Sequence, residues 1–397
     1  MAMNFFTRNI QLIHNVCLSF IFFSIPLSSF VSIRAVFVLL FFALANQRNW
    51  KDALQRASDI IAYFALLVAG LLYTTDFTTG VRVLETSFVL LAFPFLLSYE
   101  KKIDENRMQY LFRSFSTGLL VAVLICLVYA FVRFSDSGDV RVFYFYDLTR
   151  AIDFQPTYFA YYLIFAITFE LYLLNESKNK LRNFWSVFLI ILFVITLLLT
   201  GGQTSFISLL LVSSFFILKF LLEERTPSRI LAVLVTICVI CLIFFHSYFN
   251  ASRDTELLSD SWERIELWKS AISANTNFLF GEGTGDYKLV LNNYYLHHGM
   301  SEFAAKSLNA HNQFIEIFLA NGIIGVIVIL IMLGRPLYFS IKANHDLGVL
   351  VFFPFLMYGM TEVFLGRYQG VVFFVMLHQV FISYYTSNKP SLEMKDK

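Results

Sequence analysis

The sequence predicts an all-α integral membrane protein with about twelve transmembrane helices and one long loop outside the membrane. The chain has 397 residues, of which 58% are hydrophobic and only 15% are charged, whereas soluble domains carry about 25% charged residues. Apolar runs of about 18 or more residues, the length that crosses a bilayer, recur along the chain. The 47 Phe and 20 Tyr residues suit lipid-facing helices with aromatic belts at their ends.

The apolar runs define the predicted spans and the domain limits. Nine transmembrane helices are expected in residues 1–247, a large periplasmic loop with short amphipathic helices in 248–312, three more transmembrane helices in 313–386, and a cytoplasmic tail in 387–397. The individual runs are at about 10–31, 34–46, 57–74, 84–98, 110–133, 157–175, 184–201, 203–222, 229–247, 313–334, 347–363 and 367–386.

The distribution of Lys and Arg predicts the orientation of the chain. With the N-terminus in the cytoplasm, the cytoplasmic loops and the two termini hold most of the 30 basic residues. Positive residues concentrate on the cytoplasmic side of membrane proteins. The prediction is therefore a multi-pass protein of the bacterial inner membrane, with both termini inside and the 248–312 loop in the periplasm.

Several arginines break this pattern, because they lie at span mouths on the outer side. Arg82 opens the fourth span, Arg141 and Arg150 lie in the 134–156 loop, and Arg367 opens the last span. Each can extend along the membrane surface to a lipid phosphate. Charge near hydrocarbon is expensive, however, so several arginines together favour an anion site.

The 248–312 loop contains the clearest candidates for chemistry. Ile265, Trp268 and Ile272 follow helical spacing and predict a short amphipathic helix on the membrane surface. Arg264 lies one turn before Trp268, where its guanidinium is suited to grip a phosphate bidentately. The alternative is a solvated arginine paired with a neighbouring glutamate.

Two further features follow in the same loop. "LFGEGTGDYK" places glycines at 281, 283 and 285, which permits close backbone approach, as in turns that cradle phosphates. His311 stands where the loop enters an apolar helix, and a neutral imidazole there can accept a proton from a hydroxyl. A helix-capping histidine is the alternative. Asn312 and Gln313 are positioned to orient His311 or to bind sugar hydroxyls.

Taken together, these features resemble the family of O-antigen ligases and O-antigen polymerases. The matching residues are Arg264, Trp268 and Ala271, then the alternating glycines, then "HN" at 311–312 before a glycine-bearing helix. The segments "LETSFVLLAFPFLLS", "QPTYFAYYL" and "TEVFLGRYQGVVFF" extend the resemblance over most of the chain. In one respect the chain departs from the family, because Gln203 stands where members often have an arginine at the start of the eighth span.

The resemblance implies a donor glycan on undecaprenyl diphosphate and an acceptor sugar hydroxyl. It assigns the base to His311 and a diphosphate contact to Arg264, with Trp268, Asn312, Gln313 and Gln203 as substrate contacts. Arg82, Arg150 or Arg367 would replace the contact missing at Gln203, or the donor is bound differently. Attack with one base and no protein nucleophile inverts the anomeric carbon. No Asp-x-Asp metal motif occurs in the sequence, so neither a metal nor another cofactor is expected.

The prediction is an O-antigen ligase-like glycosyltransferase that acts on the periplasmic side. Its expected partners are the undecaprenyl-diphosphate-linked glycan, a lipid A–core or growing glycan acceptor, and membrane lipids, without nucleic acid. A repeat-unit polymerase of O-antigen or capsule is the alternative within the family. A flippase or transporter of lipid-linked glycans is the alternative from another class, and the absence of an internal sequence repeat counts against it.

Overall fold

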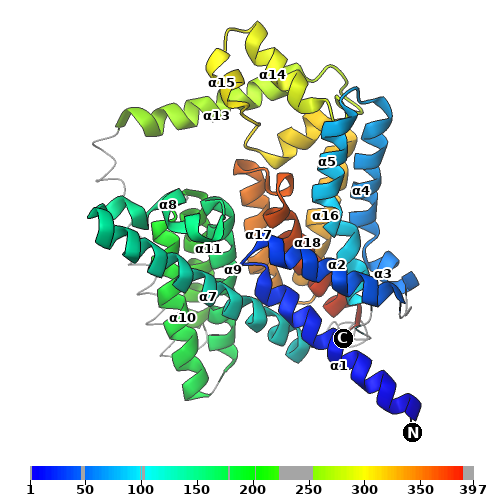
Figure 1. Cartoon of the computed structure of the whole chain (residues 1–397), viewed down its shortest axis with the longest axis vertical. Helices are drawn as coiled ribbons and strands as arrows, with labels where there is room; N and C mark the ends of the chain where they lie inside the picture. Colours follow the sequence, from blue (N-terminus) through cyan, green and yellow to red (C-terminus); the bar gives the residue numbers. More distant parts are fainter. Residues whose placement is uncertain are drawn as a thin grey trace. The chain divides into compact units, whose positions relative to one another are not determined.

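The computed structural model describes residues 2–45, 50–98, 100, 103–177, 179–201, 203–222 and 254–387, and within these ranges it contains helices and no strand. The all-α fold class is thereby confirmed for this part of the chain (Figure 1). Two compact units are present, and each is described by itself. Unit 1 comprises Met1–Ala35, Asp104–Ser252 and His345–Pro354, and unit 2 comprises Val36–Ile103, Arg253–Asn344 and Phe355–Lys397.

Six helical segments in the described ranges are long and apolar enough to cross a membrane. These are Phe77–Leu97, Glu105–Ser137, Pro156–Glu176, Lys180–Leu199, Gln313–Lys342 and Tyr368–Ser387. A seventh span results if the bent pair Trp50–Arg56 and Ser58–Tyr73 crosses as one, and four shorter apolar helices accompany these. The chain is therefore a multi-pass membrane protein, while the count of twelve spans stays a prediction. The expected span at 229–247 lies outside the described residues.

The helices of unit 1 have clear end signals in the sequence. Asp104 caps α7 by accepting a hydrogen bond from the backbone of Arg107, and Gly138 ends the helix with φ = 67°. Such caps satisfy backbone groups that a helix end leaves unpaired. The elements of unit 1 are α1 (Ala2–Ser24), α7 (Glu105–Ser137), η2 (Val140–Phe143), α8 (Phe145–Thr149), η3 (Arg150–Ile152), α9 (Pro156–Glu176), α10 (Lys180–Leu199) and α11 (Gln203–Leu222), with the starts of α2 and α17.

Unit 2 combines membrane helices with the helices of the predicted periplasmic loop. The membrane part contains most of α2 (Ser29–Ala45), α3 (Trp50–Arg56), α4 (Ser58–Gly70), η1 (Leu71–Tyr73), α5 (Phe77–Ser87), α6 (Val89–Leu97), α16 (Gln313–Lys342), the end of α17 (Asp346–Thr361), η5 (Phe364–Gly366) and α18 (Tyr368–Ser387). The loop part contains α13 (Asp254–Ala274), α14 (Tyr287–His297) and α15 (Ser301–Lys306).

A buried ionic network ties three membrane helices of unit 2 together. The Asp59 carboxylate, on α4, lies 2.7 Å from Arg335 Nη1 of α16 and 2.8 Å from His378 Nε2 of α18. The side chains of Asp59 and His378 are almost fully buried. A buried charge is tolerated only when paired, so loss of one partner would leave an expensive unpaired group. The network thus fixes the packing of α4, α16 and α18.

Candidate active site

The site is built where the predicted loop packs on the first turns of α16. Helix α13 buries Leu267, Ala271 and Ala274 in an apolar cluster with residues of α14, α15 and α16. Ile265 and Ile272, the apolar face expected from the sequence, remain exposed on the opposite side. Burial of the one face holds α13 in place and fixes the direction of Arg264 and Trp268, which are both half-buried.

Arg264 and His311, the two residues predicted to be catalytic, lie against two consecutive residues at the end of α17. Arg264 Nη1 donates a hydrogen bond to the carbonyl oxygen of Thr361 at 3.1 Å. His311 Nδ1 lies 3.6 Å from Glu362 Oε2. Arg264 and His311 are far apart in sequence, yet the end of α17 brings them to consecutive residues. Arg264 also places positive charge at the C-terminal end of α17, where the helix dipole favours it.

The backbone at His311 adopts a rare conformation. Its φ of 42° lies in the left-handed region, which costs a non-glycine residue about 1–2 kcal/mol. Neighbouring asparagines hold it there: Asn309 Oδ1 accepts from the His311 backbone N–H at 2.9 Å, and Asn312 Oδ1 caps α16 by accepting from Phe314 and Ile315. The Asn312 amide also donates to Met360 at 3.2 Å. His311 is thus held against the end of α17, with a third of its side chain exposed.

The glycine run of the loop contacts a break in α16. Gly322 leaves helical geometry with φ = 63° and ψ = −161°. Its neighbours therefore bond to the loop instead of along the helix. Glu282 N donates to Leu319 O at 2.8 Å, Gly283 N to Ala320 O at 2.9 Å, and Ile323 N to Phe278 O at 2.9 Å. A Cβ at Gly281 would lie 2.5 Å from the backbone of Ala320 and Asn321, so only glycine fits.

The same run leaves no free N–H for a phosphate cradle. The backbone N–H groups of residues 281–285 all donate within the protein, to Asn277, Leu319, Ala320, Gly70 and Thr74. The Asp286 carboxylate then accepts the backbone N–H groups of Thr75 at 2.7 Å and Asp76 at 2.6 Å. Close backbone approach, expected from the sequence, is present, but its partner is the backbone of unit 2. The loop is docked on α4, η1 and α16.

A cavity of about 300 Å³ opens in unit 2 beside this site. Arg82 and Lys288 provide positive charge in its lining, and the buried Glu316 provides a carboxylate. The Asn321 amide, fully buried in the lining, has no hydrogen-bond partner among the described residues. Burial and the Glu316 carboxylate raise the pKa of Tyr287 well above its ordinary value, so its hydroxyl keeps a proton to donate.

Of the three remaining predicted residues of unit 2, Gln313, Arg367 and Trp268, the first lines this cavity. Gln313 Oε1 accepts the backbone N–H of Leu365 at 2.7 Å. Arg367 is exposed on extended backbone directly after Gly366, which is part of the lining. Trp268 carries a buried Nε1–H that has no acceptor among the described residues.

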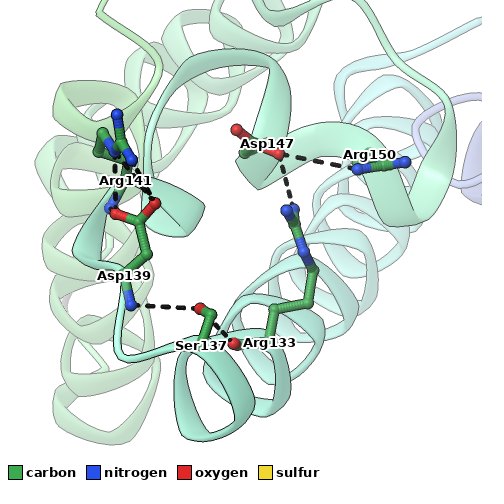
Figure 2. Close-up of polar contacts among 6 residues, drawn as sticks. All are labelled: Arg133, Ser137, Asp139, Arg141, Asp147 and Arg150. Carbon is green, nitrogen blue, oxygen red and sulfur yellow. Dashed lines mark hydrogen bonds and ion pairs between the residues drawn. The ribbon is translucent and has the colours of Figure 1, made fainter.

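Two predicted residues belong to unit 1. Gln203 begins α11, and its side chain is outside the described part of the structure. Arg150 lies 4.0 Å from Asp147, which also binds Arg133 at 2.7 Å, while Arg141 pairs with Asp139 (Figure 2). The Arg150 side chain is 65% exposed. Its predicted role in substrate binding stays a prediction.

Sequence reasoning missed four groups of this site: Glu362, Lys288, Glu316 and Asn321. Glu362 lies in the segment "TEVFLGRYQG", which drew attention only for its arginine. Glu316 and Asn321 are polar residues within an apolar helix, and such residues usually line a functional cavity. Their position three and eight residues after Gln313 was a signal that could have been used. No group of three His, Cys, Asp or Glu side chains in the described ranges is arranged to hold a metal ion.

The helices and these contacts define a class: a multi-pass membrane protein in which an arginine and a histidine contact consecutive residues, Thr361 and Glu362. Comparison with known proteins shows a similarity over part of the chain. Residues 188–330 match the family model described as O-Antigen ligase. The match confirms the resemblance to the O-antigen ligase family that was recognised in the sequence. It covers Arg264, Trp268, the glycine run and His311.

A relative from Haemophilus influenzae, an uncharacterized protein, aligns with the chain over 244 residues at 22% identity. The alignment covers 54% of this chain and 60% of that protein.

Proposed function

We propose that unit 2 carries the active site of an O-antigen ligase-like transferase, which moves a glycan from undecaprenyl diphosphate to a sugar hydroxyl of lipid A–core in the periplasm. The observation that carries this proposal is the meeting of Arg264 and His311 at Thr361 and Glu362. One residue is suited to a diphosphate and the other to a hydroxyl proton.

The reaction needs one bond formed, one bond broken and one proton moved. The acceptor oxygen attacks the anomeric carbon of the donor, and the bond from that carbon to the diphosphate oxygen breaks. The diphosphate leaves with the electron pair, and His311 takes the acceptor proton. Attack opposite the leaving group inverts the anomeric carbon.

Glu362 supports the base in this scheme. Its carboxylate lies on the Nδ1 side of His311, so it favours the tautomer with the proton on Nδ1 and leaves Nε2 free to accept. The separation of 3.6 Å exceeds a normal hydrogen bond. Contacts in ligand-free catalytic sites are often long and shorten when substrate binds.

The positive groups of unit 2 are proposed to bind the diphosphate. Arg264 is half-buried and presents a planar guanidinium that can form paired hydrogen bonds with phosphate oxygens. Arg82, with Lys288 beside it in the cavity lining, is our choice for the contact missing at Gln203. Fixed positive groups neutralise the developing charge on the leaving group, and the scheme needs no metal.

The function is tested by the polysaccharide profile of a deletion strain. We expect uncapped lipid A–core and accumulated lipid-linked polymer, and restoration by a plasmid copy. Core carrying single repeat units would instead identify the polymerase alternative. An unchanged profile would reject both.

The assignment of the base is tested with purified enzyme, lipid-diphosphate glycan, acceptor and chelator. His311→Ala should reduce transfer by roughly 10²–10⁴-fold, as expected for loss of a positioned base. The matched control is His297→Ala, because His297 is an exposed histidine of the same loop. Rates near wild type for His311→Ala would remove it from the chemistry, and loss of wild-type activity with chelator would reject the metal-free scheme.

A further inference from the structure

Unit 1 contains a second cavity that the proposed reaction does not use. It has a volume of about 410 Å³ and lies between α7, α9 and the start of α10. Its polar lining includes Arg113, Glu170 and Arg182. Arg113 stands eight residues into α7, which continues to Ser137. The cavity therefore lies near the α9–α10 connection, at the end of unit 1 that the charge distribution assigns to the cytoplasm.

The charges in this cavity do not balance. Glu170 is only 4% exposed and accepts a hydrogen bond from Ser186 at 2.7 Å. Arg113, Arg182 and Glu170 interact electrostatically, but no ion pair within 4.0 Å joins them in the described part of the chain. Arg182 Nε is buried and has no hydrogen-bond partner among the described residues. Two guanidinium groups against one carboxylate leave one positive charge for an anion.

The rim of the cavity is apolar and faces outward. Leu181 is 68% exposed and Trp185 is 54% exposed, and both line the cavity. Phe184 and Phe188 flank Trp185 with large exposed side chains on the same helix. Aromatic residues of this kind lie at the boundary between lipid tails and head groups. A ligand that fills the site therefore needs a negative head and an apolar tail.

We propose that this cavity binds the phosphate head group of an anionic phospholipid on the cytoplasmic side of the membrane. The Arg113 and Arg182 guanidinium groups hold the phosphate oxygens, and the Ser116 and Thr117 hydroxyls of the lining lie within the same cavity. The acyl chains pass over Leu181 and Trp185. Bound lipid would then act as a ligand that stabilises the packing of α7, α9 and α10.

The test uses the full-length protein in neutral detergent. Phosphatidylglycerol, phosphatidylcholine and inorganic phosphate are added separately, and retention is read by native mass spectrometry and thermal unfolding. We expect phosphatidylglycerol to bind at least tenfold more tightly than phosphatidylcholine and to raise the unfolding temperature. Inorganic phosphate at millimolar concentration should do neither. Equal effects of the two lipids would overturn the proposal, and an equal effect of inorganic phosphate would show a site for a free anion instead.

Variants locate the effect. Arg113→Gln with Arg182→Gln should remove the preference for phosphatidylglycerol. Arg141→Gln is the matched control, because Arg141 is 85% exposed at the other end of unit 1 and its loss removes the same charge. If the glutamine pair does not fold, Arg113→Lys with Arg182→Lys is used instead, because it keeps both charges. This lysine pair should bind phosphatidylglycerol less tightly than wild type, because lysine lacks the planar guanidinium. Affinity for phosphatidylglycerol equal to that of wild type in the lysine pair, or loss of the lipid preference in Arg141→Gln, would overturn the assignment.

Discussion

The contact between Gly281 and the break in α16 leads to a quantitative prediction. We expect Gly281→Ala to destabilise unit 2 strongly, although it adds a single methyl group. The new Cβ would stand 2.5 Å from the backbone of Ala320 and Asn321 and 2.6 Å from that of Gly322. These are backbone atoms of a packed helix, so they cannot move aside cheaply. The loop must therefore lift away from α16.

The size of the destabilisation follows from the backbone strain and from the hydrogen bonds between the loop and α16. Alanine at φ = 70° costs about 1–2 kcal/mol in backbone strain. Three backbone–backbone hydrogen bonds shorter than 3.0 Å join the loop to α16 at Leu319, Ala320 and Ile323, and each contributes about 1 kcal/mol. Loss of these hydrogen bonds together with the strain should lower the free energy of unfolding by roughly 4–5 kcal/mol. Such a value is exceptional for a single methyl group.

Gly299→Ala is a matched control for this change. Gly299 has φ = 73°, but a Cβ there meets nothing within 4 Å. Gly299→Ala therefore introduces the backbone strain without a steric clash, and it should lower the free energy of unfolding by only about 1–2 kcal/mol. Thermal unfolding of both variants in detergent gives the comparison, and hydrogen exchange of the segment around Ile323 reports whether the loop has lifted. Equal unfolding temperatures for the two variants, with Ile323 still protected, would refute the reasoning.

Four further predictions concern the site and its orientation. Arg264→Lys should lose most transfer activity with normal expression, because an ammonium lacks the bidentate fork; a fully active lysine variant would refute this. Glu362→Gln, which changes a positioning residue, should lower kcat roughly tenfold with little change in KM, whereas a purely structural role would lower expression instead. Burial acts to raise the pKa of Asp286, but hydrogen bonds from Asp76 and Thr75 outweigh it and hold the pKa below its ordinary value. The loop should therefore stay docked at pH values above the unfolded-state pKa of an aspartate, which is about 4. It should undock as the pH falls below that value. Protease cleavage within 275–286 should rise at that low pH in the wild type, and already at neutral pH in Asp286→Asn. Equal cleavage of the variant and the wild type at neutral pH would contradict this prediction. A reporter fused after Ser259 should be active only in a periplasmic format, and activity in a cytoplasmic format would invert the topology.

The sequence predicted helix positions well where one apolar run forms one helix. The expected spans 157–175 and 367–386 correspond to Pro156–Glu176 and Tyr368–Ser387. Hydropathy failed where a turn lies inside a run. The run at 10–31 is divided by a turn around Pro26, which lacks a backbone N–H for the helix, and α1 ends at Ser24. Conversely, the run at 84–98 missed the first turns of its span, which begins at Phe77, because Arg82 lowers the hydropathy of those turns.

The candidate site was predictable in its residue types but not in its contacts. His311 was recognisable because it stands where the loop enters an apolar helix, and Arg264 because it lies one turn before Trp268 on an amphipathic helix. The approach of Glu362 to His311 joins residues 51 positions apart, and no local pattern encodes it. Likewise, the glycines showed that some backbone approaches closely, but periodicity could not show that the approaching backbone is α16 rather than a phosphate.

The break at Gly322 explains why this part of the chain is suited to a site. Backbone groups at membrane depth must be bonded within the protein, so an interrupted helix is tolerated only where other protein or a cavity replaces its bonds. Here the loop supplies the replacement, since Glu282 and Gly283 donate to α16 and Phe278 accepts from it. The first turns of α16 are thereby separated from the rest of the span and bound to the loop. Because Asn312 begins those turns and Gln313, Glu316 and Asn321 face the cavity, the loop and the cavity are fixed relative to each other. A site that joins a periplasmic acceptor to a membrane-held donor requires this fixed relation.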